Sequence, residues 1–292
     1  MRLLLDGVVL PGQKAPSQPE LPGVGRRRLP AALVAEAGSR VPHLFDCWER
    51  ISKRIRAARD IQLFLDFDGT LAPYCDRPED VKLSGSCLQI LTRLSRRRCM
   101  HVAIVSGRRN AALRKYVPVP RIQFMGLFGW ENSGGSVLPR RTREILRALR
   151  SILAPLPVAF PGIRVEDKGF SYAVHFRGAA PDARREVQVW IRGLLTRIRP
   201  DFRAIQSNYA CEIVPRQVEG KGVAMRELIR KLRSPLLPIY VGDDLTDEPA
   251  FTALRRGITV RVAPISGTKA HYRLKSPEEV CVFLKRLEEE LS

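Results

Sequence analysis

The chain has 292 residues, 45% of them hydrophobic, which is enough for one large or two ordinary globular domains. No stretch approaches the roughly 18–20 consecutive apolar residues that span a membrane, and the opening residues are too soon followed by Pro11 and Lys14 to form a signal peptide. We therefore expect a cytoplasmic protein without a membrane partner.

The formal net charge is +20, and 40 of the 50 basic residues are arginine. A chain this basic can bind nucleic acid through phosphate contacts. The candidate patches are Arg26-Arg27-Arg28, Arg96-Arg97-Arg98 and Arg140-Arg141. Because basic residues recur along the whole chain without interleaved aromatic residues, we favour solvated arginine-rich faces over nucleic-acid binding. A positive field also attracts a small anionic substrate.

The six cysteines form no Cys-x-x-Cys pair and have no histidine cluster near them. This distribution argues against a zinc site and against a disulfide framework, and it suits a reducing compartment. We interpret most of them as small core residues.

The first half of the chain predicts an extension followed by an α/β domain. Residues 11–30 contain five prolines and are typical of a flexible lead-in, so we assign residues 1–45 to an N-terminal extension. The expected strands that follow are 61–65, 101–105 and 122–127, and the expected helices are 84–96 and 110–116. This alternation predicts a parallel sheet flanked by helices, with a site at the carboxyl ends of the strands.

The pattern changes in residues 136–216, which we predict to be an inserted domain. Two helices, 142–156 and 182–198, alternate with two β pairs, 163–167 with 170–177 and 202–206 with 209–214. The tight connection at Lys168-Gly169 is typical of an antiparallel hairpin, so the insertion is α+β. Helices 222–232, 246–254 and 277–291 and strands 237–241 and 258–262 then resume the first pattern. The α/β domain therefore comprises residues 46–135 and 217–292.

The strand at 61–65 ends in Asp66-Phe67-Asp68-Gly69-Thr70. Side chains alternate along a strand, so Asp66 and Asp68 emerge on the same side while Phe67 packs away. Two carboxylates aimed at one point are costly unless a cation or a shared proton relieves their repulsion. The pair predicts a divalent metal site or acid–base chemistry; the alternative is an Asp-Gly turn that only ends a core strand.

Polar side chains follow four of the predicted strands. They are Asp66 with Asp68, Ser106, Glu131, and the group Asp243, Asp244 and Asp247. Because parallel strands end at one edge of a sheet, we expect these groups to converge. Several carboxylate oxygens with room for water are how proteins hold Mg²⁺, which commonly bridges to a phosphate. The sequence predicts a metal-assisted phosphoryl or sugar-phosphate site.

The order of these motifs resembles the haloacid dehalogenase superfamily of aspartate-nucleophile phosphatases. The motifs are Asp-x-Asp-Gly-Thr, then Ser-Gly-Arg, then Lys221, then Gly-Asp-Asp-x-Thr-Asp-Glu at 242–248. Within the superfamily, that last string, Glu166-Asp167-Lys168 and Glu212-Ile213-Val214-Pro215 resemble the trehalose-6-phosphate phosphatase family. The resemblance covers about residues 58–290 and implies a Rossmann-like parallel sheet core with an inserted α+β cap domain.

The resemblance also implies roles for the matching residues. Asp66 would attack phosphorus, and Asp68 would act first as general acid and then as general base. The phosphate-binding residues would be Thr70, Ser106 and Lys221. The Mg²⁺ ligands would be Asp66, Asp68 through its backbone carbonyl, Asp243, and Asp247 through water, with Asp244 behind them.

Sugar recognition is assigned to charged groups, because hydroxyl-rich ligands are bound by such side chains. The candidates are Arg108, Glu131, Lys168 and Glu212. For Lys168, an exposed turn lysine is the open alternative, and we interpret His175 as a packed or hydrogen-bonded histidine.

We thus expect a Mg²⁺-dependent phosphatase that hydrolyses trehalose 6-phosphate to trehalose and phosphate through an aspartyl phosphate. The alternatives are a phosphatase of another sugar phosphate, such as sucrose phosphate or a glycosyl phosphoglycerate, and a basic nucleic-acid-binding protein. The family often has histidine at the position of Phe128 and a basic residue at that of Val214. Both differences fall in the region that selects the sugar and leave the phosphoryl-transfer residues untouched.

Overall fold

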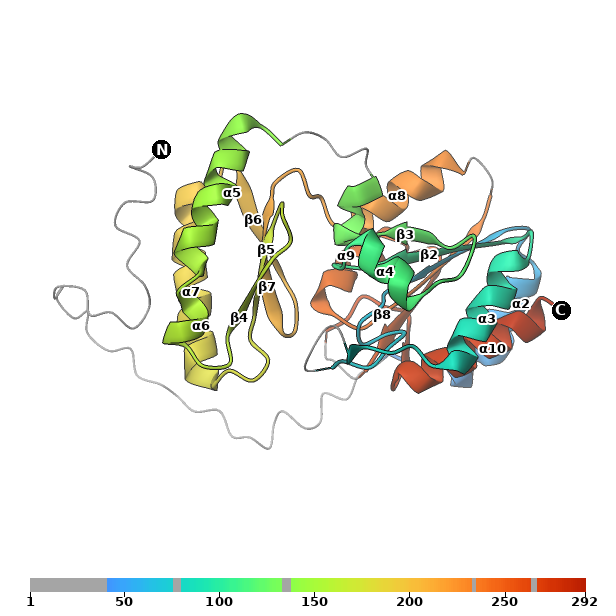
Figure 1. The fold of residues 1–292 in the computed structure, drawn as a ribbon. Coiled ribbons are helices and arrows are strands. Elements are labelled where there is room, and N and C mark those ends of the chain that lie inside the picture. Colours follow the sequence, from blue (N-terminus) through green and yellow to red (C-terminus); the bar gives the residue numbers. More distant parts are fainter. Residues whose placement is uncertain (1–40, 76–79, 133–137, 233–234, 264–266) are drawn as a thin grey trace, which may run out of the picture. The chain divides into compact units, whose positions relative to one another are not determined.

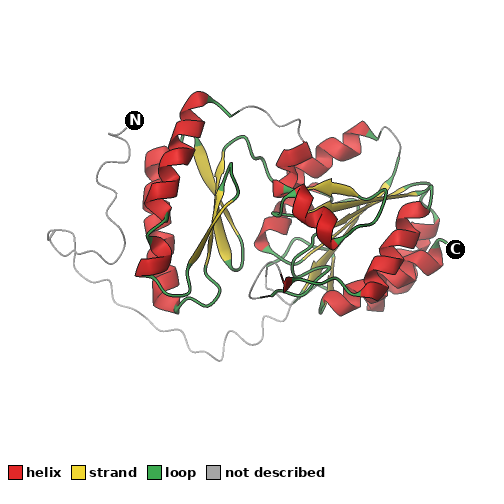
Figure 2. Cartoon of the chain, in the orientation of Figure 1, coloured by secondary structure: helices red, strands yellow, loops and turns green. Residues whose placement is uncertain are grey.

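The computed structural model describes residues 41–75, 80–132, 138–232, 235–263 and 267–292. The chain divides into two compact units, coloured along the sequence in Figure 1 and by secondary structure in Figure 2. The core unit falls within Gly38–Ser136 and Val218–Ser292, and the inserted unit falls within Val137–Gln217.

The core unit is built on a six-stranded sheet in which every neighbouring pair is parallel. The strand order is β10-β9-β8-β1-β2-β3. The strands are β1 (Ile61–Leu65), β2 (Met100–Val105), β3 (Gln123–Met125), β8 (Leu237–Gly242), β9 (Ile258–Val262) and β10 (Tyr272–Leu274). Leu65, the last residue of β1, pairs with Ile104 of β2 and Val241 of β8. The carboxyl ends of these three strands therefore lie at one edge, as the alternating sequence pattern predicts.

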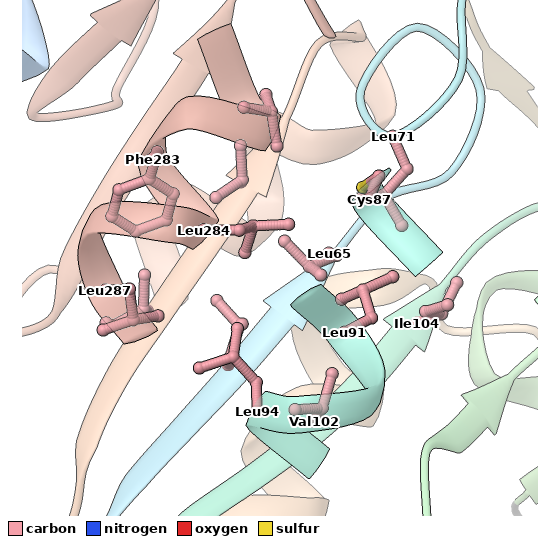
Figure 3. Packing of buried hydrophobic residues seen from close by; sticks show 14 of the residues in the cluster. Leu65, Leu71, Cys87, Leu91, Leu94, Val102, Ile104, Phe283, Leu284 and Leu287 are labelled. Atoms are coloured by element: carbon pink, nitrogen blue, oxygen red, sulfur yellow. The ribbon is translucent and has the colours of Figure 1, made fainter. Parts of the chain in front are cut away.

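Helices cover both faces of this sheet. They are α2 (Trp48–Arg56), α3 (Gly85–Arg96), α4 (Asn110–Tyr116), α8 (Lys221–Lys231), α9 (Glu248–Ala253) and α10 (Pro277–Glu290), with 3-10 turns η2 (Leu44–Cys47), η4 (Leu127–Asn132) and η5 (Leu245–Asp247). Side chains of α3 and α10 surround Leu65 in one hydrophobic cluster (Figure 3). Phe64, the preceding residue, belongs to a second cluster with Met225 of α8 and Phe251 of α9. Because β1 is buried on both faces, four of its five residues are apolar. The fifth, Gln62, is buried as well, and its Nε2 donates to His101 O at 3.2 Å.

The inserted unit is a four-stranded antiparallel sheet in the order β4-β5-β7-β6. Its elements are α5 (Arg140–Leu153), α6 (Leu156–Ala159), β4 (Arg164–Asp167), β5 (Tyr172–His175), α7 (Pro181–Ile198), β6 (Phe202–Gln206) and β7 (Ala210–Pro215). The helices pack Leu149 and Ile191 against Val174 and Ile213 of the sheet. Ser171 and Glu212 lie one residue away from such core positions, so they belong to the opposite face. The α+β prediction is confirmed.

The Lys168-Gly169 connection is a tight hairpin. Lys168 N–H donates to Ser171 O at 3.0 Å, and Gly169 has a φ of 82°, which glycine adopts without steric cost. The β4–β5 pair is antiparallel, as the sequence predicted.

Several elements differ from the sequence-based expectation. The strand expected to reach residue 127 ends at Met125, because Leu127 and Phe128 adopt positive φ values of 53° and 60° and turn the chain into η4. Strand β10 was not predicted. Core packing also begins before residue 46, since Leu44 is fully buried in the core cluster and Arg273 N–H donates to Pro42 O. Residues 1–40 of the predicted extension lie outside the described residues.

Within the described ranges, no helix is long and apolar enough to cross a membrane. All six cysteines are free thiols, with Cys87 and Cys211 buried. The absence of a disulfide agrees with the sequence-based expectation.

Candidate active site

The acid pair follows β1 in a short closed loop. Asp66 N–H donates to Val241 O of β8 at 2.9 Å, and Gly69 N–H donates to Ala72 O at 2.7 Å. Phe67 is fully buried in the core, whereas the Asp68 side chain keeps 27% of its surface exposed. The loop therefore presents the two carboxylates and packs the intervening ring inward, as expected from strand alternation.

Lys221 connects two of the carboxylates. It is the first residue of α8, and its Nζ lies 2.9 Å from Asp66 Oδ1 and 2.6 Å from Asp247 Oδ1. Burial alone would lower the pKa of Lys221, but the carboxylates of Asp247 and Asp66 outweigh it and raise that pKa. The ammonium group therefore stays charged at the centre of the site.

Asp66, Asp243 and Asp247 each place a carboxylate oxygen within 4.8 Å of the other two. Burial, with repulsion from Asp247, raises the pKa of Asp243 to about 7. Burial likewise raises the pKa of Asp66, although Lys221 opposes that shift. One lysine is too little positive charge for three buried carboxylates, and clustered carboxylate oxygens are the donors that Mg²⁺ prefers, so the residues present fit this ion.

Asp247 accepts three hydrogen bonds from protein donors, which leave its carboxylate about one lone-pair position for a cation. Oδ1 accepts hydrogen bonds from Lys221 and from Tyr240 Oη, at 2.6 and 2.5 Å, and Oδ2 accepts one from Asp244 N–H at 2.8 Å. Asp66 and Asp243 are therefore better placed to contact a metal directly, and Asp247 to act through an intervening group.

Thr70 and Ser106 reach the same edge of the sheet as buried hydroxyls. Thr70 Oγ1 donates to Asp243 Oδ1 at 3.2 Å, and Ser106 Oγ accepts from Arg108 N–H at 3.2 Å. The structure thus gives Thr70 a carboxylate partner that the sequence did not indicate. Phosphate binding by either hydroxyl stays a prediction.

Arg108 forms a two-point ion pair with Asp68. Its Nε lies 2.7 Å from Asp68 Oδ2 and its Nη2 lies 2.7 Å from Asp68 Oδ1. The guanidinium group lies over the rings of Phe67 and Tyr116, 5.4 and 5.1 Å from their centroids. Substrate contact by Arg108 stays a prediction beside this ion pair with the predicted general acid.

Glu131 of η4 makes a hydrogen bond within the core unit. Its Oε2 accepts a hydrogen bond from the N–H of Asn110, the first residue of α4, at 2.5 Å. A carboxylate at this end of a helix stabilises the exposed N–H groups there. A sugar contact by Glu131 stays a prediction beside this structural role.

Two tyrosines at the site were missed. Tyr240 of β8 donates to Asp247 Oδ1, and Tyr74 donates to Asp243 Oδ2 at 2.8 Å. A tyrosine in an apolar strand, or in a proline-containing loop, carries no spacing signal that would mark it as part of a site.

In the inserted unit the structure brings Lys168 and Glu212 together. Lys168 Nζ lies 2.9 Å from Glu212 Oε2, and Ser171 Oγ, which the sequence did not single out, donates to Glu212 Oε1 at 2.8 Å. His175 Nε2 lies 3.0 Å from Glu166 Oε2, so this histidine is hydrogen-bonded, as expected.

The arginine runs make contacts within the chain. Arg97 donates to Leu291 O at the end of α10, and Arg141 pairs with Asp201 at 2.9 Å. Arg140 pairs with Glu144, also at 2.9 Å. The run at 26–28 lies outside the described residues.

Known proteins resemble the chain over both units. The family model described as trehalose-phosphatase matches residues 64–278. A probable trehalose-phosphate phosphatase E of Arabidopsis thaliana is 31% identical over 253 residues, which cover 79% of this chain and 71% of the relative. The C-terminal domain of C. albicans trehalose-6-phosphate phosphatase has a TM-score of 0.70 at 20% identity, covering 85% of this chain and 98% of that one. A haloacid dehalogenase-like hydrolase from Bacteroides thetaiotaomicron has a TM-score of 0.56 at 14% identity, over 78% and 99% of the two chains.

The matched range includes every residue of the buried carboxylate cluster and the Lys168–Glu212 pair. The structural matches show the fold, and the family match shows the membership that the sequence motifs predicted. The chain therefore belongs to the trehalose-phosphatase family and is a phosphatase built on the haloacid dehalogenase fold.

Proposed function

We propose that the protein hydrolyses trehalose 6-phosphate to trehalose and inorganic phosphate, with Mg²⁺ and through an aspartyl phosphate. The observation that carries the proposal is the buried cluster in which Lys221 bridges Asp66 and Asp247 while Asp243 faces them. Such a cluster combines a carboxylate nucleophile, a fixed positive charge and oxygen donors for a divalent ion. Membership of the trehalose-phosphatase family supports the choice of sugar.

In the first step, an oxygen of Asp66 forms a bond to phosphorus and the bond from phosphorus to the sugar oxygen breaks. Asp68 gives a proton to the departing oxygen, so the sugar leaves as a neutral alcohol. Lys221 lies against Asp66 and so stabilises negative charge on the phosphoryl oxygens at the point of transfer.

In the second step, Asp68 takes a proton from water while that water attacks phosphorus, and Asp66 is regenerated as phosphate leaves. One carboxyl group can serve both steps, because giving up its proton in the first prepares it as a base for the second. The position of Asp68, two residues after the nucleophile and more exposed than it, suits contact with both the sugar oxygen and water.

Asp66 and Asp243 would hold Mg²⁺ directly, together with the Asp68 backbone carbonyl, and Asp247 would act through water. When bound, the ion offsets the charge of the carboxylates and of the phosphate that approaches them. Ser106, at the end of β2, and Thr70 are the further candidates for binding phosphate oxygens.

The inserted unit would act as the cap domain that binds the sugar. Its Lys168, Ser171 and Glu212 form a hydrogen-bonded group of the kind that recognises hydroxyl-rich ligands. Arg108 and Glu131 remain the candidates from the core unit.

Phosphate release from a panel of sugar phosphates tests the proposal. Trehalose 6-phosphate, sucrose phosphate and a glycosyl phosphoglycerate would be compared, each with Mg²⁺ and with EDTA. We expect the highest kcat/KM for trehalose 6-phosphate and no turnover in EDTA. Asp66→Asn, which keeps the shape of the side chain, should abolish turnover without unfolding the protein. If another sugar phosphate gives a higher kcat/KM, that compound is the substrate instead of trehalose 6-phosphate. If the Asp66→Asn protein is active, Asp66 is not the nucleophile.

A further inference from the structure

Tyr74 and Thr70, from the loop after β1, bind both oxygens of Asp243. Tyr74 Oη lies 2.8 Å from Asp243 Oδ2, and Thr70 Oγ1 lies 3.2 Å from Asp243 Oδ1. Asp243 follows β8, so these contacts join two loops that are distant in sequence. An ionised carboxylate has about four lone-pair positions, so both oxygens keep the capacity to bind a cation after accepting these bonds.

Gly69 makes this arrangement sterically possible. It has a φ of +79°, and a Cβ atom there would lie 2.2 Å from Asp243 Oδ2 and 2.5 Å from Tyr74 Cε2. The carboxylate and the phenol ring therefore occupy the space that any other residue would fill. The close approach to the Gly69 backbone limits where the Asp243 carboxylate can turn, and the Tyr74 hydrogen bond selects one orientation.

The hydroxyl of Tyr74 lies next to a group of carboxylates. Asp243 is 4% exposed and is repelled by Asp247 and Asp244, both of which disfavour its charged form. The Tyr74 hydroxyl donates into this group of carboxylates and so offsets part of that repulsion. An ionised carboxylate only accepts hydrogen bonds, so the phenol is the donor of this one.

We propose that Tyr74 is a positioning residue of the metal site, whose phenol fixes the Asp243 carboxylate for binding Mg²⁺. The inference rests on the proposed Mg²⁺-dependent function and adds a residue to it. Groups that orient a metal ligand in this way typically contribute 10–100-fold to metal affinity. Tyr74 itself need not contact the ion or the substrate.

Tyr74→Phe removes the hydroxyl and leaves the ring beside Gly69. Mg²⁺ binding to the EDTA-treated, dialysed full chain would be measured by isothermal titration calorimetry, without substrate. We expect a Kd about 10–100-fold weaker than that of the unaltered protein. Tyr209→Phe, at a 42% exposed tyrosine of the inserted unit, is the matched control and should leave the Kd unchanged. Asp243→Asn should abolish measurable binding.

Kinetics separate positioning from a general structural effect. In Tyr74→Phe, the Mg²⁺ concentration for half-maximal activity should rise by the same factor, while kcat at saturating Mg²⁺ changes much less. Thermal unfolding of the metal-free variants reports any loss of fold, and a loss shared by Tyr74→Phe and the Tyr209→Phe control would count against a specific role. If Asp243→Asn loses Mg²⁺ but Tyr74→Phe binds it normally, the Tyr74 inference is wrong and the proposed function stands. If the unaltered chain neither binds Mg²⁺ nor needs it for turnover, both are wrong.

Discussion

Arg108 holds both carboxylate oxygens of Asp68, at 2.7 Å each. The proposed first step needs one of those oxygens to donate a proton to the departing sugar oxygen. The pair must therefore open at one oxygen at least during the reaction, while the other contact keeps the carboxyl group in place. The guanidinium group lies over the stacked rings of Phe67 and Tyr116, whose centroids are 5.7 Å apart, and these contacts hold Arg108 in position.

Arg108→Ala is expected to lower kcat for trehalose 6-phosphate by about 10–100-fold, because an unheld Asp68 loses part of the advantage of positioned acid catalysis. An aryl phosphate has a leaving group that departs readily as a phenolate, so it needs little help from an acid. Its kcat should fall much less. Steady-state kinetics on both substrates measure the difference.

Arg98→Ala removes an exposed arginine before β2 and controls for the change in net charge. It should leave both rates unaltered. Equal losses on the two substrates in Arg108→Ala would contradict a role through the general acid and would point to a role in binding phosphate.

Lys221→Met should inactivate the enzyme and destabilise its metal-free form by about 3–5 kcal/mol, because it leaves buried carboxylates without their cation. The methionine side chain preserves most of the volume. Urea unfolding in EDTA measures the loss, and adding Mg²⁺ should recover part of it if the ion binds the same carboxylates. An unchanged unfolding midpoint in EDTA would show that Lys221 does not stabilise the buried carboxylates.

The metal-free protein should lose stability as the pH rises from about 5 to 7. Folded Asp243 holds its proton up to about pH 7, whereas its ordinary pKa is 3.8, so unfolding in this window releases a proton. Higher pH therefore favours unfolding, by a few kcal/mol over the window, and the slope ends above about pH 7. Mg²⁺ binds the ionised form, so its affinity should increase over the same range.

Denaturant unfolding in EDTA across this pH range checks the slope. Asp243→Asn is the control, because it keeps the shape of the side chain and removes its titration. Histidines such as His271 titrate in both proteins, so their contribution to the pH dependence cancels in the difference. The pKa of His271 is lowered, first by burial, so its contribution has the opposite sign. A slope that persists unchanged in Asp243→Asn would contradict the assignment to this residue.

Much of the core was predictable because its strands are buried on both faces. Leu63 and Phe64 belong to different hydrophobic clusters, so β1 is apolar at every position except Gln62 and stands out in the sequence. Strand β10 has only three residues, with Arg273 at its centre, and it exists through pairing with β9. Local composition gives no signal for a strand defined by its partner.

Part of the candidate site was likewise predictable from the sequence, and part was not. Asp66, Lys221 and Asp247 were predicted from their motifs, and the parallel sheet explains why they meet. The contact of Tyr74 with Asp243 joins residues 169 positions apart and depends on the shape of the loop around Gly69. The ion pair between Arg108 and Asp68 likewise depends on the conformation of the loops, which the residue types alone do not determine.

Glu212→Gln should lower kcat/KM for trehalose 6-phosphate by about 10–100-fold, since a charged hydrogen bond contributes about 1.5–3 kcal/mol. The change leaves the residue isosteric while weakening its bonds to Lys168 and Ser171. The aryl phosphate should be nearly unaffected, because it has no sugar to recognise. Glu186→Gln, at an exposed glutamate of α7, is the control. Equal losses on both substrates would argue against a sugar site in the inserted unit.

Arg261 links the loop that carries Asp243 to the rest of the core unit. Its Nη1 donates to Asp244 O at 2.7 Å and lies 3.2 Å from Glu248 Oε1, and its side chain is 2% exposed. Glu248 also accepts bonds from Thr268 Oγ1 and Lys269 N–H. Arg261 therefore fixes the backbone on which the carboxylate cluster is built.

Arg261→Met should destabilise the protein by about 3–5 kcal/mol, because it leaves Glu248 without its cation and the Asp244 carbonyl without its donor. Glu248→Gln alone should also destabilise the protein, since it removes the carboxylate that offsets the charge of the buried guanidinium. The double variant should lose less than the sum of the two, because each single change already breaks the same pair. Urea unfolding of the four proteins measures the coupling. Additive losses would show that Arg261 acts on Asp244 alone, and the Glu248 contact would then contribute nothing to stability.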